Sequence, residues 1–349
     1  MIVAMKADAL QAEIKAVIDR ISNHDLNALP LPGGERTAIG IASAIPPDMR
    51  SDLTSLLESM PGVDHVTQVT RTYKRASREF HPGDTLITVK GVTIGGNEVI
   101  VAAGPCAIES REQLFSAAEV VKACGGKMLR GGAFKPRTSP YAFQGLGIEG
   151  LKMLKEAGEA TGLVTATEVM DQHELDAVVE HADIIQIGAR NMQNYPLLIA
   201  VGKTNRPVIL KRGPSATIDE WLLAAEYILA QGNQDVILCE RGVHPLERGH
   251  TRYTLDLSAV PVARFLSHLP VIVDPSHACG NWRYVSAMSK AAVAAGADGL
   301  LMEIHPDPAH ALCDGAQSLK LDAFSELITQ LRGVAAAVGR GISTPPLPA

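Results

Sequence analysis

Short apolar runs alternate with amphipathic segments from Glu98 to the end of the chain. Between the runs, hydrophobic residues recur every three or four positions, as at Ile218, Leu222, Ala225 and Leu229, which predicts helices. Runs this apolar are typical of parallel strands that are buried on both faces. The eight predicted strands are Val99–Gly104, Lys127–Gly131, Leu163–Glu168, Ile184–Gly188, Pro207–Lys211, Val236–Cys239, Val271–Val273 and Gly299–Ile304.

Eight strand–helix units within about 250 residues match the size of a (β/α)8 barrel. The main alternative is a doubly wound open sheet, but no Gly-x-Gly-x-x-Gly loop follows the first strand. We therefore expect an α/β fold with a (β/α)8 TIM barrel over residues 98–340. A linker and hairpin over 76–97 would precede it, and a flexible tail over 341–349 would follow.

The first 75 residues have a different pattern. A short apolar strand at Met1–Met5 is followed by a helix with one hydrophobic face. A hairpin then turns at Pro32-Gly33-Gly34 and returns through Thr37–Ala42. A second helix and a last strand between Val63 and Val69 complete the order βαββαβ. This order predicts a small ferredoxin-like α+β domain over residues 1–75, with a regulatory or oligomerisation role.

Composition narrows the class of protein. The 349 residues include 32 basic and 38 acidic side chains, a net charge of −6, which disfavours nucleic-acid and membrane-surface partners. No apolar run approaches the roughly 20 residues that a membrane span requires, and the N-terminus lacks a signal-peptide layout. The five cysteines are scattered, as expected for reduced thiols. We expect a cytoplasmic protein.

Metal-binding side chains stand at three predicted strand ends and in the loop after the last strand. The carboxyl ends of barrel strands meet at the active site, so these side chains could converge on one ion. A thiolate, an imidazole and two carboxylates suit Mn²⁺, Fe²⁺, Co²⁺, Zn²⁺ or Cd²⁺ better than Mg²⁺. Taken singly, Cys106 is more often a small buried core residue and His277 a hydrogen-bonded loop histidine than a metal ligand. The candidate ligands of one divalent ion are Cys106, His277, Glu303 and Asp314.

Cationic side chains gather at the same strand ends. In an acidic protein, so many positive groups around one barrel mouth would repel each other unless anions bind between them. They indicate a phosphorylated acid as substrate, although each could instead pair with a neighbouring carboxylate. The candidates are Arg130, Lys135, Arg137, Arg190, Lys211 and Arg241.

Lys211 allows a second chemistry. A desolvated lysine at a strand end, next to Arg212, could form a Schiff base as metal-free aldolases do. That interpretation leaves the four candidate metal ligands without a role.

Six segments along the predicted barrel together resemble one enzyme family. They are Gly104-Pro-Cys-Ala-Ile-Glu-Ser110, Leu129-Arg-Gly-Gly-Ala-Phe-Lys-Pro-Arg-Thr-Ser139, Ile187-Gly-Ala-Arg-Asn191, Leu210-Lys-Arg-Gly213, Cys239-Glu-Arg-Gly242 and Asp274-Pro-Ser-His277. In this order they resemble 3-deoxy-D-arabino-heptulosonate 7-phosphate (DAHP) synthase, in the short microbial form that has an N-terminal ferredoxin-like domain.

A sister family, 3-deoxy-D-manno-octulosonate 8-phosphate synthase, is the nearest alternative and would use arabinose 5-phosphate. It typically has Lys-Ala-Asn-Arg where this chain has Lys135-Pro-Arg-Thr138. Its metal-free members have Asn at the position of Cys106. The resemblance therefore implies a metal-dependent enzyme that uses erythrose 4-phosphate.

The resemblance also implies a reaction and a set of residues. Phosphoenolpyruvate would condense with erythrose 4-phosphate and release phosphate, in the first step of the shikimate pathway to aromatic amino acids. The implied catalytic residues are Lys135, Glu168, Lys211 and His277. The implied phosphoenolpyruvate residues are Arg130, Lys135, Glu168, Ala189, Arg190, Lys211 and Arg241, with Asp274 also in the substrate site. The implied erythrose 4-phosphate residues are Arg137, Thr138 and Ser139. The base that activates water is open between Lys135, Glu168 and a water on the metal.

Regulation and assembly follow less directly. Relatives with this extension bind inhibitory aromatic amino acids in the small domain, but here Ala28–Pro32 offers few hydrogen-bonding side chains. We expect weak or absent inhibition by tyrosine and phenylalanine. Contacts within an oligomer would explain the presence of the small domain as well as feedback control would. A homotetramer or homodimer, and a chorismate mutase partner, are compatible with the family. A non-catalytic sensor is disfavoured because no expected ligand of the site is missing.

Overall fold

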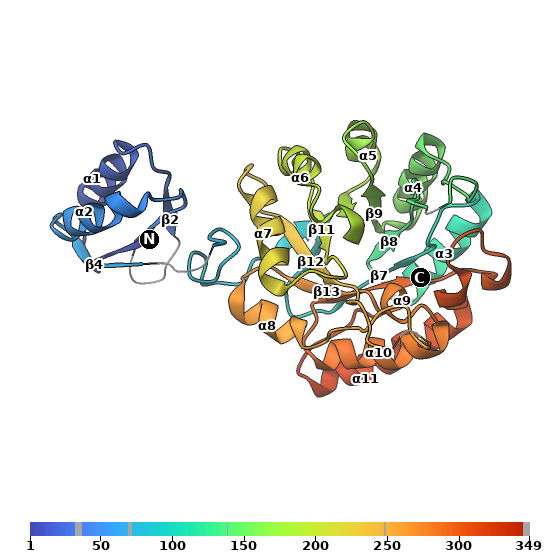
Figure 1. Cartoon of the computed structure of the whole chain (residues 1–349). Helices are drawn as coiled ribbons and strands as arrows, with labels where there is room; N and C mark the ends of the chain where they lie inside the picture. The colour runs from blue at the N-terminus through green and yellow to red at the C-terminus, as the bar shows by residue number, and fades with distance from the viewer. Residues whose placement is uncertain (32–36, 69–71, 138, 248, 345–349) are drawn as a thin grey trace. The chain divides into compact units, whose positions relative to one another are not determined.

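The structure is a computed structural model that describes residues 1–31, 37–68, 72–137, 139–247 and 249–344. The chain divides into two compact units (Figure 1). The first comprises Met1–Gly83 with Leu266–His268, and the second comprises Asp84–Phe265 with Leu269–Ala349.

The first unit has the predicted ferredoxin-like fold. Its antiparallel sheet has the order β2-β3-β1-β4, and two helices pack on it (Figure 1). Alternate residues of the central strand, Val3 and Met5, are buried against the helices. The elements are β1 (Ile2–Met5), α1 (Gln11–Ser22), β2 (Ala28–Leu31), β3 (Ala38–Ile41), α2 (Pro47–Glu58) and β4 (Val63–Thr67). The predicted turn at Pro32-Gly33-Gly34 lies outside the described residues.

The second unit is the predicted barrel. Eight parallel strands close on themselves, because Gly299–Glu303 pairs in register with Ile100–Gly104, and this excludes an open sheet. The strands are β7 (Ile100–Gly104), β8 (Met128–Arg130), β9 (Val164–Val169), β10 (Ile184–Ile187), β11 (Val208–Lys211), β12 (Val236–Glu240), β13 (Val271–Val273) and β14 (Gly299–Glu303). Their side chains are almost all buried, as the apolar runs predicted.

Helices surround the barrel (Figure 1). Side-chain caps fix where several of them begin, as at Ser110, which accepts from the Gln113 N–H, and at Thr217, which forms a capping box with Glu220. The helices are α3 (Arg111–Ala123), α4 (Ile148–Thr161), α5 (Leu175–His181), α6 (Tyr195–Gly202), α7 (Ile218–Leu229), α8 (Ala259–Leu266), α9 (Pro275–Cys279), α10 (Trp282–Ala294) and α11 (Leu321–Ala337).

An apolar hairpin closes the N-terminal end of the barrel. It consists of β5 (Ile87–Val89) and β6 (Val92–Ile94), which pair antiparallel. Ile87 and Ile94 are buried in one cluster with residues at the starts of the barrel strands, including Ile100. Lys90 at its turn forms an ion pair with Asp183, which precedes β10 (2.8 Å). The sequence predicted this hairpin only as a segment leading into the barrel. In the structure the hairpin β5–β6 covers the N-terminal end of the barrel, and we call it the floor.

The predicted tail begins later than expected. Gly341 accepts a hydrogen bond from the Val99 N–H (2.8 Å), and Arg332 donates to the Ser343 carbonyl (3.1 Å). Ile342 is buried. Residues 341–343 are therefore held against the barrel rather than flexible, and residues 345–349 lie outside the described residues.

Candidate active site

A cavity of about 330 Å³ opens at the C-terminal end of the barrel. Ten of the predicted site residues line it: Lys135, Arg137, Ser139, Glu168, Ala189, Arg190, Lys211, Arg241, His277 and Asp314. They come from the ends of seven of the eight strands or from the loops that follow them, so the fold brings together residues far apart in sequence.

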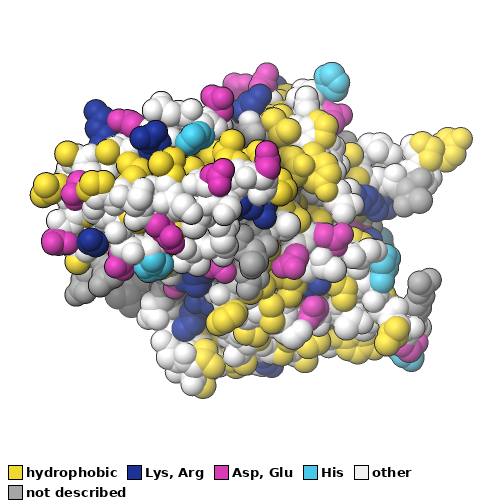
Figure 2. Space-filling view, turned by 60° about the vertical axis from the view of Figure 1, so that its left-hand side comes forward, with side chains coloured by type: hydrophobic (Ala, Val, Ile, Leu, Met, Phe, Trp, Pro, Cys, Tyr) yellow, Lys and Arg dark blue, Asp and Glu magenta, His cyan; other side chains and the backbone are white. Residues whose placement is uncertain are grey.

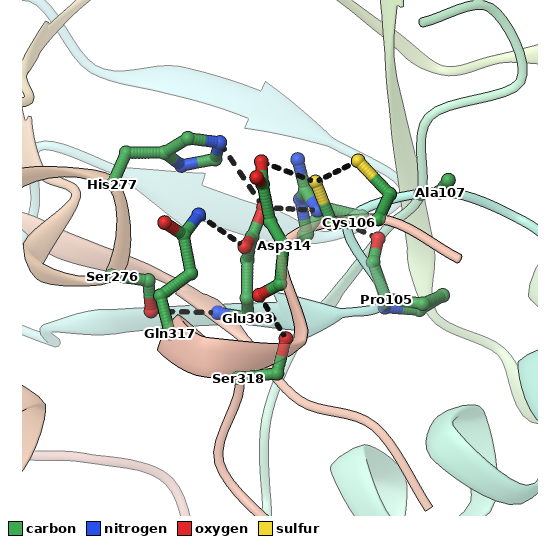
Figure 3. Close-up of polar contacts among 12 residues, drawn as sticks. Pro105, Cys106, Ala107, Ser276, His277, Glu303, Asp314, Gln317 and Ser318 are labelled. Atoms are coloured by element: carbon green, nitrogen blue, oxygen red, sulfur yellow. Dashed lines mark hydrogen bonds and ion pairs between the residues drawn. The ribbon is translucent and has the colours of Figure 1, made fainter. Parts of the chain in front are cut away.

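The four candidate metal ligands meet beside this cavity (Figure 3). Cys106 follows β7, His277 lies on α9, Glu303 ends β14, and Asp314 lies in the loop beyond. One potential donor atom from each residue lies within 4.8 Å of all the others. Asp314 adopts a left-handed backbone conformation (φ 50°), which turns the loop at this point. The residues predicted to converge on one ion are therefore close enough to do so.

Asp274 orients the imidazole of His277. Its Oδ2 lies 2.7 Å from His277 Nδ1, and its Oδ1 accepts the His277 N–H (2.9 Å). Burial alone would raise the pKa of Asp274, but His277 and Lys211 hold that pKa well below its usual range. An ionised carboxylate only accepts hydrogen bonds, so Nδ1 must carry a proton. Burial lowers the pKa of His277 despite Asp274 and Glu303, which leaves a lone pair on Nε2.

Glu303 lies opposite that lone pair. Its Oε1 lies 3.1 Å from His277 Nε2 and 3.2 Å from Arg130 Nη1, and its Oε2 accepts from Gln317 Nε2 (2.6 Å). Burial raises the pKa of Glu303, but His277, Arg130 and Lys135 outweigh it and lower the pKa. A neutral imidazole nitrogen and an ionised oxygen are both acceptors, so this contact needs a cation or a proton to bridge them.

Two thiols and two cations lie on the other side of the cluster. Cys106 Sγ is 3.3 Å from Asp314 Oδ2, 3.5 Å from Cys313 Sγ and 3.2 Å from Lys135 Nζ. The hydrogen bond with Cys313, together with burial and Glu303, raises the pKa of Cys106. The same hydrogen bond lowers the pKa of Cys313, which Arg137 also contacts. Cys313, one of the five scattered cysteines, is thus part of the site.

Cations surround the remainder of the cavity. Lys211 Nζ donates to Asp274 Oδ2 (2.7 Å), and Arg190 donates to the Pro136 carbonyl (2.8 Å). Because Lys211 Nζ is held by this buried ion pair, the contact disfavours the Schiff-base alternative at Lys211. The guanidinium of Arg241 stacks 4.2 Å from the ring centroid of Tyr253. Burial raises the pKa of Tyr253, but Arg241 and Arg252 outweigh it and lower the pKa.

Glu168 is the carboxylate that faces these cations. Gln186 donates to its Oε2 (3.1 Å) from the neighbouring strand β10. A Cβ at Gly188 would lie 2.0 Å from Glu168 Oε1, so only glycine leaves room for the carboxylate here.

Two predicted substrate residues, Arg130 and Asp274, do not line the cavity. Arg130 and Asp274 are buried behind the cavity wall, where they hold Glu303, His277 and Lys211. Thr138 lies outside the described residues. Conversely, Arg252 and Tyr253 line the cavity but were not predicted, because they stand more than ten residues beyond the end of β12. Gln317 was missed because a neutral amide gave no charge signal.

The surface carries the mixture of acidic and basic side chains that the composition predicts. On the face drawn in Figure 2, acidic and basic side chains are interspersed among the described residues. Within the described parts of the chain, no helix is long and apolar enough to cross a membrane.

Comparison with known proteins identifies both parts of the chain. Residues 75–338 match the DAHP synthetase I family, and residues 1–71 match the DAHP synthase ferredoxin-like domain. A curated relative from Thermotoga maritima, a phospho-2-dehydro-3-deoxyheptonate aldolase, is 47% identical over 339 residues, covering 97% of this chain and 99% of its own. A 2-dehydro-3-deoxyphosphooctonate aldolase from Syntrophotalea carbinolica is 34% identical and covers 73% of this chain and 97% of its own.

Solved structures agree. A crystal structure of the Thermotoga maritima aldolase (DAHP synthase) has a TM-score of 0.77 at 46% identity, covering 97% of this chain and 98% of its own. A truncated form of the Thermotoga maritima synthase has a TM-score of 0.72 at 47% identity, covering 76% of this chain and 97% of its own. The octulosonate aldolase is the more distant relative, at 34% identity against 47%, so that alternative is less supported. The chain belongs to the DAHP synthetase I family, as its six sequence segments predicted.

Proposed function

We propose that the cavity holds phosphoenolpyruvate and erythrose 4-phosphate side by side, next to one divalent cation, and that the DAHP synthase reaction takes place there. The observation that carries the proposal is the contact between His277 Nε2 and Glu303 Oε1 (3.1 Å). Two acceptors face each other within a group of four potential metal donors, directly beside a cavity lined by cations. A cation at this point would satisfy both acceptors.

The donor set fits a borderline divalent metal. Cys106, His277, Glu303 and Asp314 would hold the ion, and Mn²⁺ is our first choice, with Fe²⁺, Co²⁺, Zn²⁺ and Cd²⁺ as alternatives. When bound, the ion would act as a Lewis acid toward the aldehyde oxygen of the sugar phosphate. The raised pKa of Cys106 means that binding must displace its proton, so affinity for the metal should increase with pH.

Fixed cations would hold the two anions together. Lys211, Arg190 and Arg241 line the cavity and would hold the phosphate of phosphoenolpyruvate, with Glu168 and Ala189 alongside. Arg130 lies behind the cavity wall, but its Nε is buried without a hydrogen-bond partner among the described residues, which supports the assignment of Arg130 to the substrate carboxylate. Arg137 and Ser139 line the part of the wall assigned to erythrose 4-phosphate. Positioning both anions this way offsets their mutual repulsion before they react.

The chemistry joins C3 of phosphoenolpyruvate to the aldehyde carbon of erythrose 4-phosphate. Water then adds to the cationic C2, and inorganic phosphate leaves as its C–O bond breaks. Burial lowers the pKa of Lys135, but Cys106 and Glu168 outweigh it and raise the pKa, so its ammonium can stabilise the alkoxide but cannot accept a proton. Glu168, a carboxylate in the cavity wall, is therefore the better base of these two side chains for the attacking water.

Erythrose 4-phosphate rather than arabinose 5-phosphate is the proposed acceptor, because Lys135-Pro-Arg-Thr138 has the DAHP-synthase form. We also propose a cytoplasmic enzyme that assembles as a homotetramer or homodimer. Weak or absent inhibition by tyrosine and phenylalanine, and docking of a chorismate mutase, remain predictions.

Phosphate release tests the proposed function. The protein is stripped of metal with a chelator and then assayed with phosphoenolpyruvate and either erythrose 4-phosphate or arabinose 5-phosphate, before and after Mn²⁺ is restored. We expect release only with Mn²⁺ and at least tenfold faster with erythrose 4-phosphate. Release that is independent of erythrose 4-phosphate in the metal-loaded protein would overturn the proposal.

A further inference from the structure

Gln317 is a buried amide directly behind the metal-ligand cluster. It ends the short 3-10 helix η3 (Gly315–Gln317) and is 2% exposed. Its Nε2 donates to Glu303 Oε2 (2.6 Å), and its Oε1 accepts from Arg252 Nη1 (3.2 Å). Figure 3 shows the amide directed at the Glu303 carboxylate. The two partners fix which way the amide faces, because the reverse orientation would place oxygen against carboxylate and nitrogen against guanidinium.

Glu303 is held on both carboxylate oxygens. Oε1 contacts Arg130 and His277, whereas Oε2 receives the bond from Gln317. The Glu303 backbone N–H donates to Ser276 Oγ (3.0 Å), which fixes its main chain at the end of β14. Gln317 thus sets the rotation of the carboxylate group about its last bond.

Arg252 connects this amide to a second candidate ligand. Its Nη1 lies 3.6 Å from Asp314 Oδ1 as well as 3.2 Å from Gln317. The Arg252 N–H donates to the Cys279 carbonyl at the end of α9 (3.2 Å), the helix that carries His277. A Cβ at Gly280 would lie 2.6 Å from Arg252 Cβ, so glycine at this position leaves room for the arginine.

We propose that Gln317 and Arg252 are positioning residues of the metal site, which hold Glu303 and Asp314 in the orientation that binds the ion. Outer partners of this kind orient ligands, and their removal typically weakens metal binding about 10- to 100-fold. Arg252 also lines the substrate cavity, so the same side chain faces the anions and the ligand cluster. The inference rests on the proposed metal site.

A purely structural role would move different measurements. If Gln317 only tied its loop to the barrel, its loss would lower the melting temperature of the metal-free protein and leave the affinity of the folded protein unchanged. If it positions Glu303, the dissociation constant for the metal increases, and the ligand-field spectrum of bound Co²⁺ changes at saturation. Direct metal binding therefore separates the two roles without an activity assay.

The test compares Gln317→Leu with Gln186→Leu, a matched control. Gln186 is equally buried and also donates to a carboxylate, that of Glu168, which is not a candidate metal ligand. Mn²⁺ binding is followed by the electron paramagnetic resonance signal of the free ion, and Co²⁺ spectra are recorded at saturation. We expect Gln317→Leu to raise the Kd for Mn²⁺ about 10- to 100-fold and Gln186→Leu to leave it within twofold.

The outcomes distinguish a failure of the proposed metal site from a failure of the positioning role. A wild-type protein that binds no Mn²⁺ would overturn the metal site and this inference together. Wild-type binding with a Gln317→Leu Kd within twofold, and an unchanged Co²⁺ spectrum, would overturn only this inference. If Gln317→Leu does not fold, Arg252→Met tests the positioning role in its place. The Arg252 side chain is 38% exposed, so we expect the fold to tolerate its replacement. Arg252→Met should raise the Kd at least threefold, and a smaller change would contradict the positioning role.

Discussion

The two ends of the barrel are closed by opposite chemistry. At the N-terminal end, the hairpin β5–β6 packs Ile87 and Ile94 against apolar strand starts. At the C-terminal end, buried charges form pairs beside a cavity, Lys211 with Asp274 and Arg130 with Glu303. Burying apolar surface stabilises a fold, whereas burying charges costs stability unless each is paired. Stability and chemistry are thus assigned to different ends of the same barrel.

The largest expected effect separates two lysine–aspartate pairs of nearly equal length. Lys211 lies 2.7 Å from Asp274 at the cavity, and Lys90 lies 2.8 Å from Asp183 at the floor. Lys211→Met should lower kcat/KM for phosphate release roughly 10³-fold, because it removes a fixed cation from the proposed phosphate position. Lys90→Met should leave kcat/KM within twofold, since its side chain is half exposed. Near-ultraviolet circular dichroism checks that both variants fold. A decrease in kcat/KM of less than tenfold in Lys211→Met would contradict the difference expected between the two pairs.

A cysteine pair tests the metal site. Cys106→Ser should lower metal-dependent activity by roughly 10²-fold or more, because a hydroxyl is a far poorer ligand than a thiolate for a borderline metal. Cys124→Ser should change neither activity nor metal content, since Cys124 contacts Ser325 between α3 and α11. Metal content after dialysis and phosphate release are the measurements. Equal metal content in both variants would contradict the assignment of Cys106.

The floor should respond in stability rather than in chemistry. Ile94→Ala should lower the free energy of unfolding by about 3 kcal/mol, because it leaves a cavity in a fully buried cluster. Leu86→Ala, at an exposed position just before the hairpin, should cost less than about 0.5 kcal/mol. Urea unfolding gives both values. A lower kcat in folded Ile94→Ala would show that the two ends are not independent.

The smallest effect is a pH dependence at the C-terminal end, outside the ligand cluster. Burial raises the pKa of Asp256, but hydrogen bonds from Ser258 and Arg212 outweigh it and lower the pKa. A depressed carboxyl pKa contributes stability that is present above the unfolded pKa of about 4 and is lost as pH falls below it. Asp256→Asn should therefore flatten the loss of stability between pH 5 and pH 3, whereas Ile94→Ala should shift the whole curve. If stability depends on pH in Asp256→Asn as it does in the wild type, the lowered pKa of Asp256 is contradicted.

Burial on both faces made the barrel strands readable from sequence. Each apolar run, such as Val236–Cys239, is close to the observed strand because a parallel strand inside a ring of helices has no polar face. The floor was not readable, because Ile87 and Ile94 in short strands give no sign of what they cover.

The sequence predicted which residues belong to the candidate active site better than it predicted which residues their side chains contact. Position at a strand end placed Cys106, His277 and Glu303 near one another, but not the direction of each side chain. Asp274 was expected in the substrate site, and in the structure its carboxylate contacts His277 and Lys211. Arg252 reaches the cavity from a long loop, and no periodicity encodes such a path.

Anomalous diffraction is the most direct test of the charged end of the barrel. Crystals soaked with Mn²⁺ and phosphoenolpyruvate would be measured at the manganese absorption edge. We predict one strong peak within bonding distance of Cys106 Sγ, His277 Nε2, Glu303 and Asp314, with phosphoenolpyruvate in the adjacent cavity. A peak elsewhere, or none at these four residues, would contradict the assignment of catalysis to this cluster.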